Sequence, residues 1–466
     1  MKTRKLFLAL TMLLSAAFVQ AAHNPYSSYT ANLPFSMPEI IAPQFPDNTV
    51  KLSDFGAKGD GTALCTGAFE KAIDALSKKG GGRLIVPLGV WLTGPIVLRS
   101  NIDLHLEQGA IILFSGDKSL YPVVETIYEG KTDRRCQSPI TGKDLVNVAI
   151  TGHGVIDGNG QNWRPVKKFK LTDRQWKKMT GNGGIMSEKK DLWYPSEEHI
   201  RMRPVLLELV SCRNVLLKDV AFQNSPAWNL HPLMCENVII DGVTARNPFY
   251  AQNGDALDLE SCRNALVVRS TFDAGDDCIC VKSGKDKEGR KRNRPCENVV
   301  IADCTVFAGH GGFTVGSEMS GGIKNILIRD CQFLGTDVGI RFKSTRGRGG
   351  IVENIFINGI SMFNIVEDAI TFDLYYGGKS VTDDMDGIEQ QSATARIKPD
   401  ETTPCFRDIT IENIVCSGAA RALYFNGLPE QPITNVTLRN INITADKEGE
   451  FHYCEGVRKE NVLIRK

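Results

Sequence analysis

Four short motifs with acidic or basic side chains follow one another in the second half of the chain: Asn253-Gly254-Asp255, Gly275-Asp276-Asp277, Gly309-His310-Gly311 and Arg341-Phe342-Lys343. Inverting hydrolysis of a glycosidic bond needs a protonated carboxylic acid at the leaving oxygen and a carboxylate that activates water, with the carboxyl groups about 6.5–9.5 Å apart. Three clustered aspartates supply both groups, and their mutual repulsion raises the pKa of one so that it keeps its proton. Together with two nearby cations, the acids suggest cleavage of an acidic sugar chain.

Each motif alone has an ordinary explanation, because an Asp pair occurs by chance in loops and an Arg-x-Lys strand is most often a solvated face. The spacing is what makes the set informative. Asp255 and Asp276 are 21 residues apart, and Arg341 and Lys343 point to the same face of a strand. A fold that repeats at about this interval would stack the motifs in neighbouring layers roughly 4.8 Å apart.

A repeat of this kind is visible in the sequence. An Asn opens each of several short β-branched runs, at steps of 23, 27, 34, 27 and 29 residues; these are Asn214, Asn237, Asn264, Asn298, Asn325 and Asn354, with further copies at Asn147, Asp408, Asn435 and Asn461. Short strands without intervening amphipathic helices are typical of a β-solenoid, in which each coil buries apolar side chains on its neighbours. The sequence therefore predicts an all-β fold, a right-handed single-stranded parallel β-helix.

One amphipathic helix is predicted between residues 62 and 79. Phe69, Ile73 and Leu76 fall on one face, and Gly80-Gly81-Gly82 ends the helix. We expect it to cap the first coil, whose strand edges would otherwise be unpaired. Because a solenoid grows in one direction, residues 22–466 are predicted to form a single domain.

Residues 1–21 have the features of a secretory signal peptide. Three cations among the first five residues precede an apolar stretch from Leu6 to Phe18, and Val19-Gln20-Ala21 resembles a cleavage site. We expect the mature chain to begin near Ala22 and to be exported, to the periplasm or the medium. No later run approaches the ~18 apolar residues of a membrane span. Removal of the three cations changes the formal charge from +1 to −2, so net charge indicates no partner.

Thirteen cysteines in an exported chain raise the question of disulfides. Cys212, Cys235, Cys262 and Cys296 all lie two residues before a repeat Asn, so they would occupy equivalent places in successive coils. We therefore favour a ladder of reduced, buried thiols over a disulfide framework. No metal or cofactor is expected, since no CxxC pair or second His completes a ligand set.

The four motifs and the segment Asp54–Gly61 resemble those of glycoside hydrolase family 28, the polygalacturonase family, whose members carry Asn-Thr-Asp, Gly-Asp-Asp, Gly-His-Gly and Arg-Ile-Lys on a right-handed parallel β-helix. The resemblance extends over nearly the whole mature chain. By this resemblance, Asp276 is the general acid, and Asp255 and Asp277 are the pair that activates water. His310 would support the acid.

The same resemblance implies the substrate contacts. Asn253, Arg341 and Lys343 would bind the sugar, the two cations holding a galacturonate carboxylate at the cleavage point. A Tyr after the basic motif would stack on the sugar ring, and either Tyr375 or Tyr376 is in place for this, with ordinary strand packing as the alternative. Gly254 and Phe342 replace the family's Thr and Ile, which removes no titratable group.

The resemblance implies hydrolysis of α-1,4-galacturonosyl linkages in pectin or polygalacturonate with inversion. The segments Gly316–Gly322 and Ser344–Gly350 are most similar to exo-acting members. Two long insertions, from Asp157 to Pro204 and from Tyr376 to Pro404, would close one end of the groove and restrict cleavage to chain ends. An endo-acting polygalacturonase and a hydrolase of rhamnogalacturonan or xylogalacturonan remain alternatives.

The stretch from Lys282 to Arg294 contains seven cations, and Arg346 and Arg348 extend it. Such a field would attract an acidic polysaccharide, although a solvated loop is an equal explanation. Nucleic acid is disfavoured because the patch is local and its only aromatic is Phe342. We expect a monomer. A pectate lyase using an Arg base and calcium, and a non-catalytic polysaccharide-binding β-helix, are the alternatives from other classes.

Overall fold

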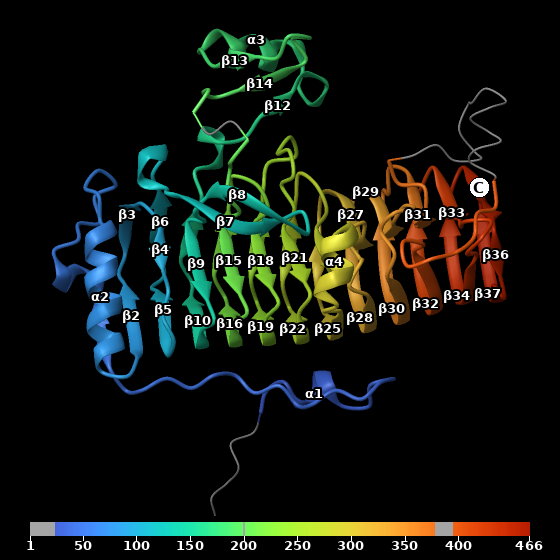
Figure 1. The fold of residues 1–466 in the computed structure, drawn as a ribbon, viewed down its shortest axis with the longest axis horizontal. Helices are drawn as coiled ribbons and strands as arrows, with labels where there is room; N and C mark the ends of the chain where they lie inside the picture. Colours follow the sequence, from blue (N-terminus) through green and yellow to red (C-terminus); the bar gives the residue numbers. More distant parts are fainter. Residues whose placement is uncertain (1–23, 199–200, 378–394) are drawn as a thin grey trace, which may run out of the picture.

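The computed structural model describes residues 24–198, 201–377 and 395–466. The chain winds into a parallel β-helix whose coils follow one another along the long axis of the molecule (Figure 1). The predicted parallel β-helix is therefore confirmed. The predicted signal peptide and much of the second insertion lie outside the described residues.

One wall of the β-helix is an 11-stranded parallel sheet that carries the acidic and basic motifs. From the first coil to the last, its strands are β4 (Ile96–Val97), β9 (Ile140–Lys143), β15 (Leu207–Val210), β18 (Leu230–Leu233), β21 (Leu257–Glu260), β24 (Ile279–Lys282), β27 (Gly309–Gly316), β29 (Thr336–Lys343), β31 (Asp368–Asp373), β33 (Arg421–Asn426) and β35 (Lys447–His452).

The other walls belong to a 21-stranded sheet with two files of strands. The longer file contains β1 (Thr49–Lys51), β2 (Gly82–Val86), β5 (Ile102–Leu106), β10 (Val146–Gly152), β16 (Arg213–Lys218), β19 (Glu236–Asp241), β22 (Arg263–Val268), β25 (Cys296–Ala302), β28 (Ile323–Leu334), β30 (Ile351–Phe363), β32 (Cys405–Ser417), β34 (Ile433–Thr444), β36 (Cys454–Glu455) and β37 (Arg458–Arg465). The shorter file contains β3 (Gly89–Thr93), β6 (Ala110–Phe114), β11 (Val155–Asp157), β17 (Ala221–Gln223), β20 (Thr244–Arg246), β23 (Thr271–Asp273) and β26 (Thr305–Val306).

The repeat Asn side chains form a ladder along the β-helix. The amide of Asn237 donates to Asn214 Oδ1 at 3.0 Å, and that of Asn264 donates to Asn237 Oδ1 at 3.2 Å; the same contact links 101, 147, 214, 237, 264, 298, 325 and 354 in order. The ladder residues have positive φ, for example 58° at Asn214, a conformation that Asn tolerates well. Each Asn therefore fixes a sharp turn and binds the next coil.

Apolar side chains of every coil fill one continuous core. Phe342, which stands where the family has Ile, points into this core and stacks on Phe372 with ring centroids 4.2 Å apart. Phe372 stacks in turn on Phe425, and Phe425 on Phe451. The replacement of Ile by Phe342 thus extends a buried aromatic stack and does not alter the outer face of the sheet.

The predicted capping helix is present as α2 (Thr66–Lys78), which buries Phe69, Ala72, Ile73 and Leu76 against the first coil. A second covering element is the N-terminal strap, residues 24–48, which includes α1 (Ser27–Thr30) and runs along the outside of the longer file of strands (Figure 1). The strap hydroxyls of Tyr26 and Tyr29 donate to Asp241 and Asp303 at 2.9 and 2.8 Å. Within the part of the chain that is described, no helix is both long and apolar enough to cross a membrane.

Two segments project from the β-helix on the side of the 11-stranded sheet. The first is the hairpin of β7 (Val123–Tyr128) and β8 (Lys131–Cys136). The second is the insertion that follows Asp157, and it rises as a separate lobe above the sheet (Figure 1). The lobe contains η3 (Gly160–Asn162), β12 (Val166–Lys167), η4 (Lys168–Lys170), α3 (Asp173–Gly181), β13 (Ile185–Met186) and β14 (Leu192–Tyr194). The remaining short elements are η1 (Leu52–Phe55), η2 (Lys118–Leu120) and α4 (Asp286–Arg292).

Candidate active site

The parallel register brings the three predicted acids together. Asp255 and Asp277 each lie two residues before a strand, and those strands pair with Leu257 opposite Ile279. One carboxylate oxygen from each of Asp255, Asp276 and Asp277 lies within 4.8 Å of the others. This oxygen spacing is tighter than the carboxyl separation of 6.5–9.5 Å that we expected from inverting enzymes in general.

Asp277 is the most strongly paired of the three. Lys343 Nζ lies 2.6 Å from Asp277 Oδ2, and Arg341 Nη1 lies 3.3 Å from Oδ1, so both carboxylate oxygens face a cation. Burial acts to raise the pKa of Asp277, but Lys343 and Arg341 outweigh it and hold the pKa below its ordinary value. Burial likewise acts to lower the pKa of Lys343, and Asp277 reverses the effect. Asp277 is therefore a fixed carboxylate.

Asp276 and Asp255 have opposite surroundings. His310 Nδ1 lies 3.2 Å from Asp276 Oδ1. Burial acts to raise the pKa of Asp276, but the hydrogen bond and charge of His310, together with the charge of Lys343, outweigh it and lower this pKa. Burial raises the pKa of Asp255, with Asp258 and Asp276 adding repulsion. Asp255 Oδ1 is buried and has no hydrogen-bond partner among the described residues.

This distribution differs from the simple expectation that Asp276 carries the proton. The three carboxyl groups titrate together, so their protons belong to the cluster. In the unliganded site the favoured place for a proton is Asp255, because it is buried and is the least paired of the three. A general acid at Asp276 requires that substrate binding move the proton.

Tyr375 and Tyr376, the two candidates for stacking on the sugar ring, differ in burial. Tyr375 is 6% exposed and belongs to the core. Tyr376 is 39% exposed, and its ring centroid lies 4.9 Å from Lys343 Nζ and 5.6 Å from Arg341 Cζ. Tyr376 is therefore the aromatic side chain beside the two cations.

Asn253 is held by a residue that sequence reasoning missed. The buried Arg203 donates from Nη2 to Asn253 Oδ1 at 2.6 Å and from Nη1 to the carbonyl of Pro226 at 3.2 Å. Asn253 has a φ of 49°, which suits an Asn in a tight turn. Nothing in the sequence around Arg203 marks it for this role, because it lies at the end of the insertion, 50 residues from its partner.

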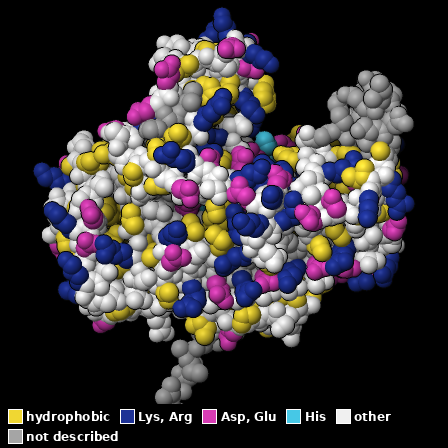
Figure 2. Space-filling model, in the orientation of Figure 1, with side chains coloured by type: hydrophobic (Ala, Val, Ile, Leu, Met, Phe, Trp, Pro, Cys, Tyr) yellow, Lys and Arg dark blue, Asp and Glu magenta, His cyan; other side chains and the backbone are white. Residues whose placement is uncertain are grey.

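Lys170 is a second residue that sequence reasoning missed. It comes from η4 in the lobe, and its Nζ lies 3.1 Å from the carbonyl oxygen of Gly275 and 3.2 Å from His310 Nε2. The lobe thus contacts the backbone next to Asp276 and the histidine that faces this acid. In Figure 2, Lys and Arg side chains gather on the part of the lobe that faces the body of the β-helix.

The cation-rich stretch after β24 is largely paired within the protein. Lys282 is buried and contacts Glu318 at 3.0 Å, and Arg292 contacts Glu260 at 3.2 Å. Lys285 and Asp286 contact the hairpin, with Lys131 Nζ 2.7 Å from Asp286. These contacts make the stretch a support for the hairpin, and they neutralise three of its seven cations, Lys282, Lys285 and Arg292.

The cysteine prediction is confirmed, since all thirteen cysteines are unpaired and most are buried. Cys212, Cys235, Cys262 and Cys296 lie in consecutive coils of the core. The three clustered carboxylates are close enough to share a cation, but Lys343 already contacts one oxygen of Asp277.

Comparison with known proteins identifies the family. Residues 82–462 match the family model described as glycosyl hydrolases family 28. The chain belongs to glycosyl hydrolase family 28. This family 28 chain is 32% identical over 406 residues to a probable polygalacturonase of Vitis vinifera, covering 85% of this chain and 74% of that protein. It is 30% identical over 385 residues to an exo-poly-alpha-D-galacturonosidase of Dickeya chrysanthemi, covering 78% of this chain and 61% of that protein.

A solved structure agrees with these relatives. The family 28 chain matches the crystal structure of a hyperthermoactive exopolygalacturonase from Thermotoga maritima with a TM-score of 0.77 and 33% identity, covering 91% of this chain and 94% of that one. The chain is thus a glycosidase of family 28.

Proposed function

We propose that this family 28 hydrolase removes galacturonate units from the ends of polygalacturonate or pectin chains. The observation that carries the proposal is the cluster of three carboxylates with Asp277 held between Lys343 and Arg341. The cluster supplies acid and base, and the cations lie where an acidic sugar would be cleaved. Asp276 is 20% exposed and His310 36% exposed at the side chain, so a substrate has access to them.

In this mechanism Asp276 donates a proton to the leaving oxygen, while Asp255 and Asp277 hold and deprotonate the attacking water. Lys343 and Arg341 bind the substrate carboxylate and keep Asp277 ionised. Tyr376 stacks on the sugar beside them, and Asn253, oriented by Arg203, contributes a free amide NH2. His310 contacts the acid.

We propose inversion in spite of the short oxygen spacing. A retaining enzyme needs an accessible carboxylate oxygen that is free to attack the sugar, but both oxygens of Asp277 are paired with cations and Asp255 is buried. Proton NMR of the first product on polygalacturonate tests this assignment. A product with retained anomeric configuration would make one aspartate a nucleophile and overturn the water-activating role.

The proposal of chain-end cleavage rests on the lobe and on two relatives that are named as exo-acting. The lobe stands beside the acids and would block one end of a bound chain. Early digests should then contain galacturonate monomer or dimer while the viscosity of the solution falls slowly. A ladder of mid-sized oligomers with an early collapse of viscosity would indicate internal cleavage.

The product analysis also separates hydrolysis from the other functions. A lyase would release unsaturated products that absorb ultraviolet light, and a binding protein would release none. We further propose that the chain is exported after cleavage near Ala22 and acts as a one-domain monomer of residues 22–466. N-terminal sequencing of the exported protein and its sedimentation behaviour test these two points.

A further inference from the structure

The ammonium group of Lys170 touches the imidazole of His310 on the side away from the acids. Lys170 Nζ lies 3.2 Å from His310 Nε2, and His310 Nδ1 lies 3.2 Å from Asp276 Oδ1. The two contacts place one ring nitrogen against a cation and the other against the proposed general acid. Lys170 is brought there by the lobe, 140 residues away in the sequence.

The chemistry of these groups determines the tautomer of His310. A lysine ammonium only donates hydrogen bonds, so the Nε2 that faces it must accept and carry no hydrogen. The neutral ring then carries its hydrogen on Nδ1 and donates it to Asp276 Oδ1. A carboxyl oxygen that accepts this bond is best left unprotonated. Burial lowers the pKa of Lys170, and the nearby Asp276 and Asp337 offset only part of this effect.

A competing partner faces the same ring nitrogen. Asp337 Oδ2, at the start of β29, lies 3.9 Å from His310 Nε2. A carboxylate at this place accepts a hydrogen bond from a protonated Nε2, which is the opposite of what Lys170 requires. His310 is therefore held between a donor and an acceptor that favour different tautomers.

We propose that Lys170 is a positioning residue that couples the tautomer of His310, and through it the protonation of Asp276, to the arrival of the substrate carboxylate. This inference rests on the proposed function, since it needs an acidic sugar. In the free enzyme Lys170 holds the Nδ1–H form and Asp276 is a carboxylate. A uronate carboxylate that enters the site draws Lys170 away from Nε2, and Asp337 then accepts a hydrogen bond from the Nε2–H group.

The protons balance in this sequence. The Nδ1 hydrogen passes to Asp276 Oδ1 along the existing hydrogen bond, and Nε2 takes a proton from solvent. Asp255, which favours the proton in the unliganded cluster, releases one to solvent as it becomes the water-activating carboxylate. The number of protons on the site is unchanged, and Asp276 is now the acid.

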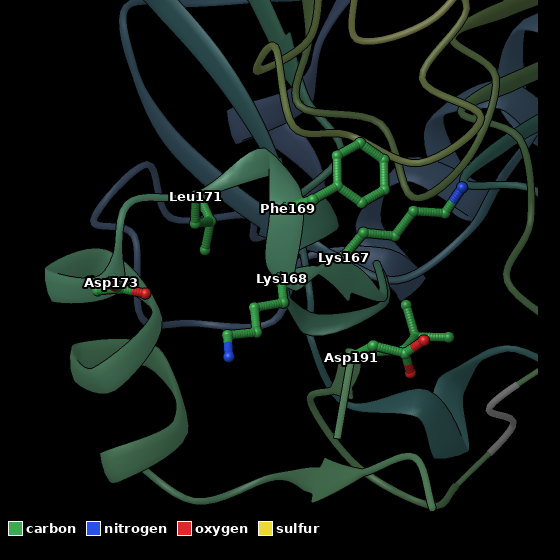
Figure 3. Close-up of a pocket in the computed structure, with 7 residues that line it drawn as sticks. Lys167, Lys168, Phe169, Leu171, Asp173 and Asp191 are labelled. Atoms are coloured by element: carbon green, nitrogen blue, oxygen red, sulfur yellow. The ribbon is translucent and has the colours of Figure 1, made fainter. Parts of the chain in front are cut away.

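Several charged groups face this pair, and the test must separate Lys170 from them. The elements around Asp276 and His310 contribute Asp255, Asp277, Asp337, Arg341, Lys343, Glu367 and Lys170. Lys168 lies on the same turn η4 and gives a matched control, because it is exposed. It lines a pocket of the lobe together with Lys167 and Phe169, and its side chain points away from theirs (Figure 3).

The first experiment reads the tautomer directly. Nitrogen-15 spectra of histidine-labelled protein, with His310 assigned by His310→Gln, should show the Nδ1–H form in the free enzyme. Galacturonate added as the probe should convert His310 toward the Nε2–H form. In Lys170→Met the Nε2–H form should already be present without galacturonate, whereas Lys168→Met should behave as the wild type. An Nε2–H ring in the free wild type would overturn the proposal.

The second experiment reads the acid through the pH dependence of kcat/KM on polygalacturonate. Loss of a cation near Asp276 should move the basic limb of the profile to higher pH by about one unit or more in Lys170→Met. Asp337→Asn should move the same limb to lower pH, and Lys170→Arg should restore the wild-type position. Lys170→Met could instead lower kcat while the basic limb of its pH profile stays at the wild-type position. Lys170 would then be only a structural contact, and the proposal would be overturned.

The two experiments distinguish this inference from the function on which it rests. If neither the wild type nor Lys168→Met releases reducing ends from polygalacturonate, the proposed function has failed. The nitrogen-15 spectra still decide the tautomer in that case, because they need no turnover. The wild type could be active and have the Nδ1–H form of His310, yet keep that form when galacturonate is added. This result would refute the coupling and leave the proposed function intact.

Discussion

Replacement of Lys343 by Met tests how much the ion pair between Lys343 and Asp277 contributes to stability. The side chains of Lys343 and Asp277 are only 7% and 1% exposed, and their charged atoms are 2.6 Å apart. Solvent therefore screens the pair little. Removing one partner of a buried pair costs about 3–5 kcal/mol, because the other charge is left uncompensated. Arg341 still faces Asp277 at 3.3 Å in this variant. We therefore expect its free energy of unfolding to fall by about 3 kcal/mol, the lower end of this range.

The double variant Lys343→Met/Asp277→Asn provides the control. With both charges removed, no buried charge of the pair is left alone, so the double variant should be more stable than the sum of the two single losses implies. Urea unfolding of the four proteins measures this coupling. Both variants that lack Lys343 should be nearly inactive, which separates stability from catalysis. Strict additivity of the single losses would refute the reasoning.

The pH dependence of the same comparison has a definite sign. The pKa of Asp277 is lowered in the folded protein, so its stabilising effect is present above the unfolded pKa of about 3.9 and is lost as pH falls through the folded pKa. Without Lys343, burial raises that pKa and Asp277 takes a proton on mild acidification. The stability gap between wild type and Lys343→Met should therefore be largest at neutral pH and shrink in acid. A gap that widens in acid would contradict this account.

Three further predictions concern catalysis, packing and substrate choice. Asp276→Asn should lower kcat about 10²–10⁴-fold with little change in the binding of oligogalacturonate by calorimetry; more than a tenth of the activity would remove it as the acid. Phe342→Ile, which restores the family's residue, should cost about 1–2 kcal/mol in urea unfolding through loss of its stack on Phe372 while kcat and KM stay unchanged. Methyl-esterified pectin should be a poorer substrate than polygalacturonate in reducing-sugar assays, because the ester removes the charge that Arg341 and Lys343 bind; equal rates would exclude this pairing.

The fold and the acids followed from the sequence because both depend on spacing. A repeated Asn marks the same turn in each coil, and residues one coil apart must lie side by side in a parallel register. That reasoning located Asp255, Asp276, Asp277 and the cations that pair with Asp277. It did not give the distance between the carboxylates, which depends on how each side chain is held.

The residues that were missed come from segments without a repeat. Lys170 and Arg203 lie in the insertion, where no period relates a residue to its neighbours in space. Their contacts with His310 and Asn253 depend on the path of the lobe. The cation-rich stretch shows the opposite limit of composition, because the hairpin that neutralises part of its charge is far away in sequence.

The N-terminal strap changes how such a solenoid can open. In a repeat protein each coil contacts only its neighbours, so unfolding can begin at an end and spread one coil at a time. The strap joins Tyr26 to Asp241 and Tyr29 to Asp303, and Phe35 packs near Phe356 in a later coil. Opening any of these coils therefore breaks contacts with a segment that also holds the others. During synthesis the strap emerges before the coils that it covers, and the surface that receives it is complete only after the coil of Phe356 has formed. Docking of the strap is thus a late step that joins separately formed coils into one cooperative unit.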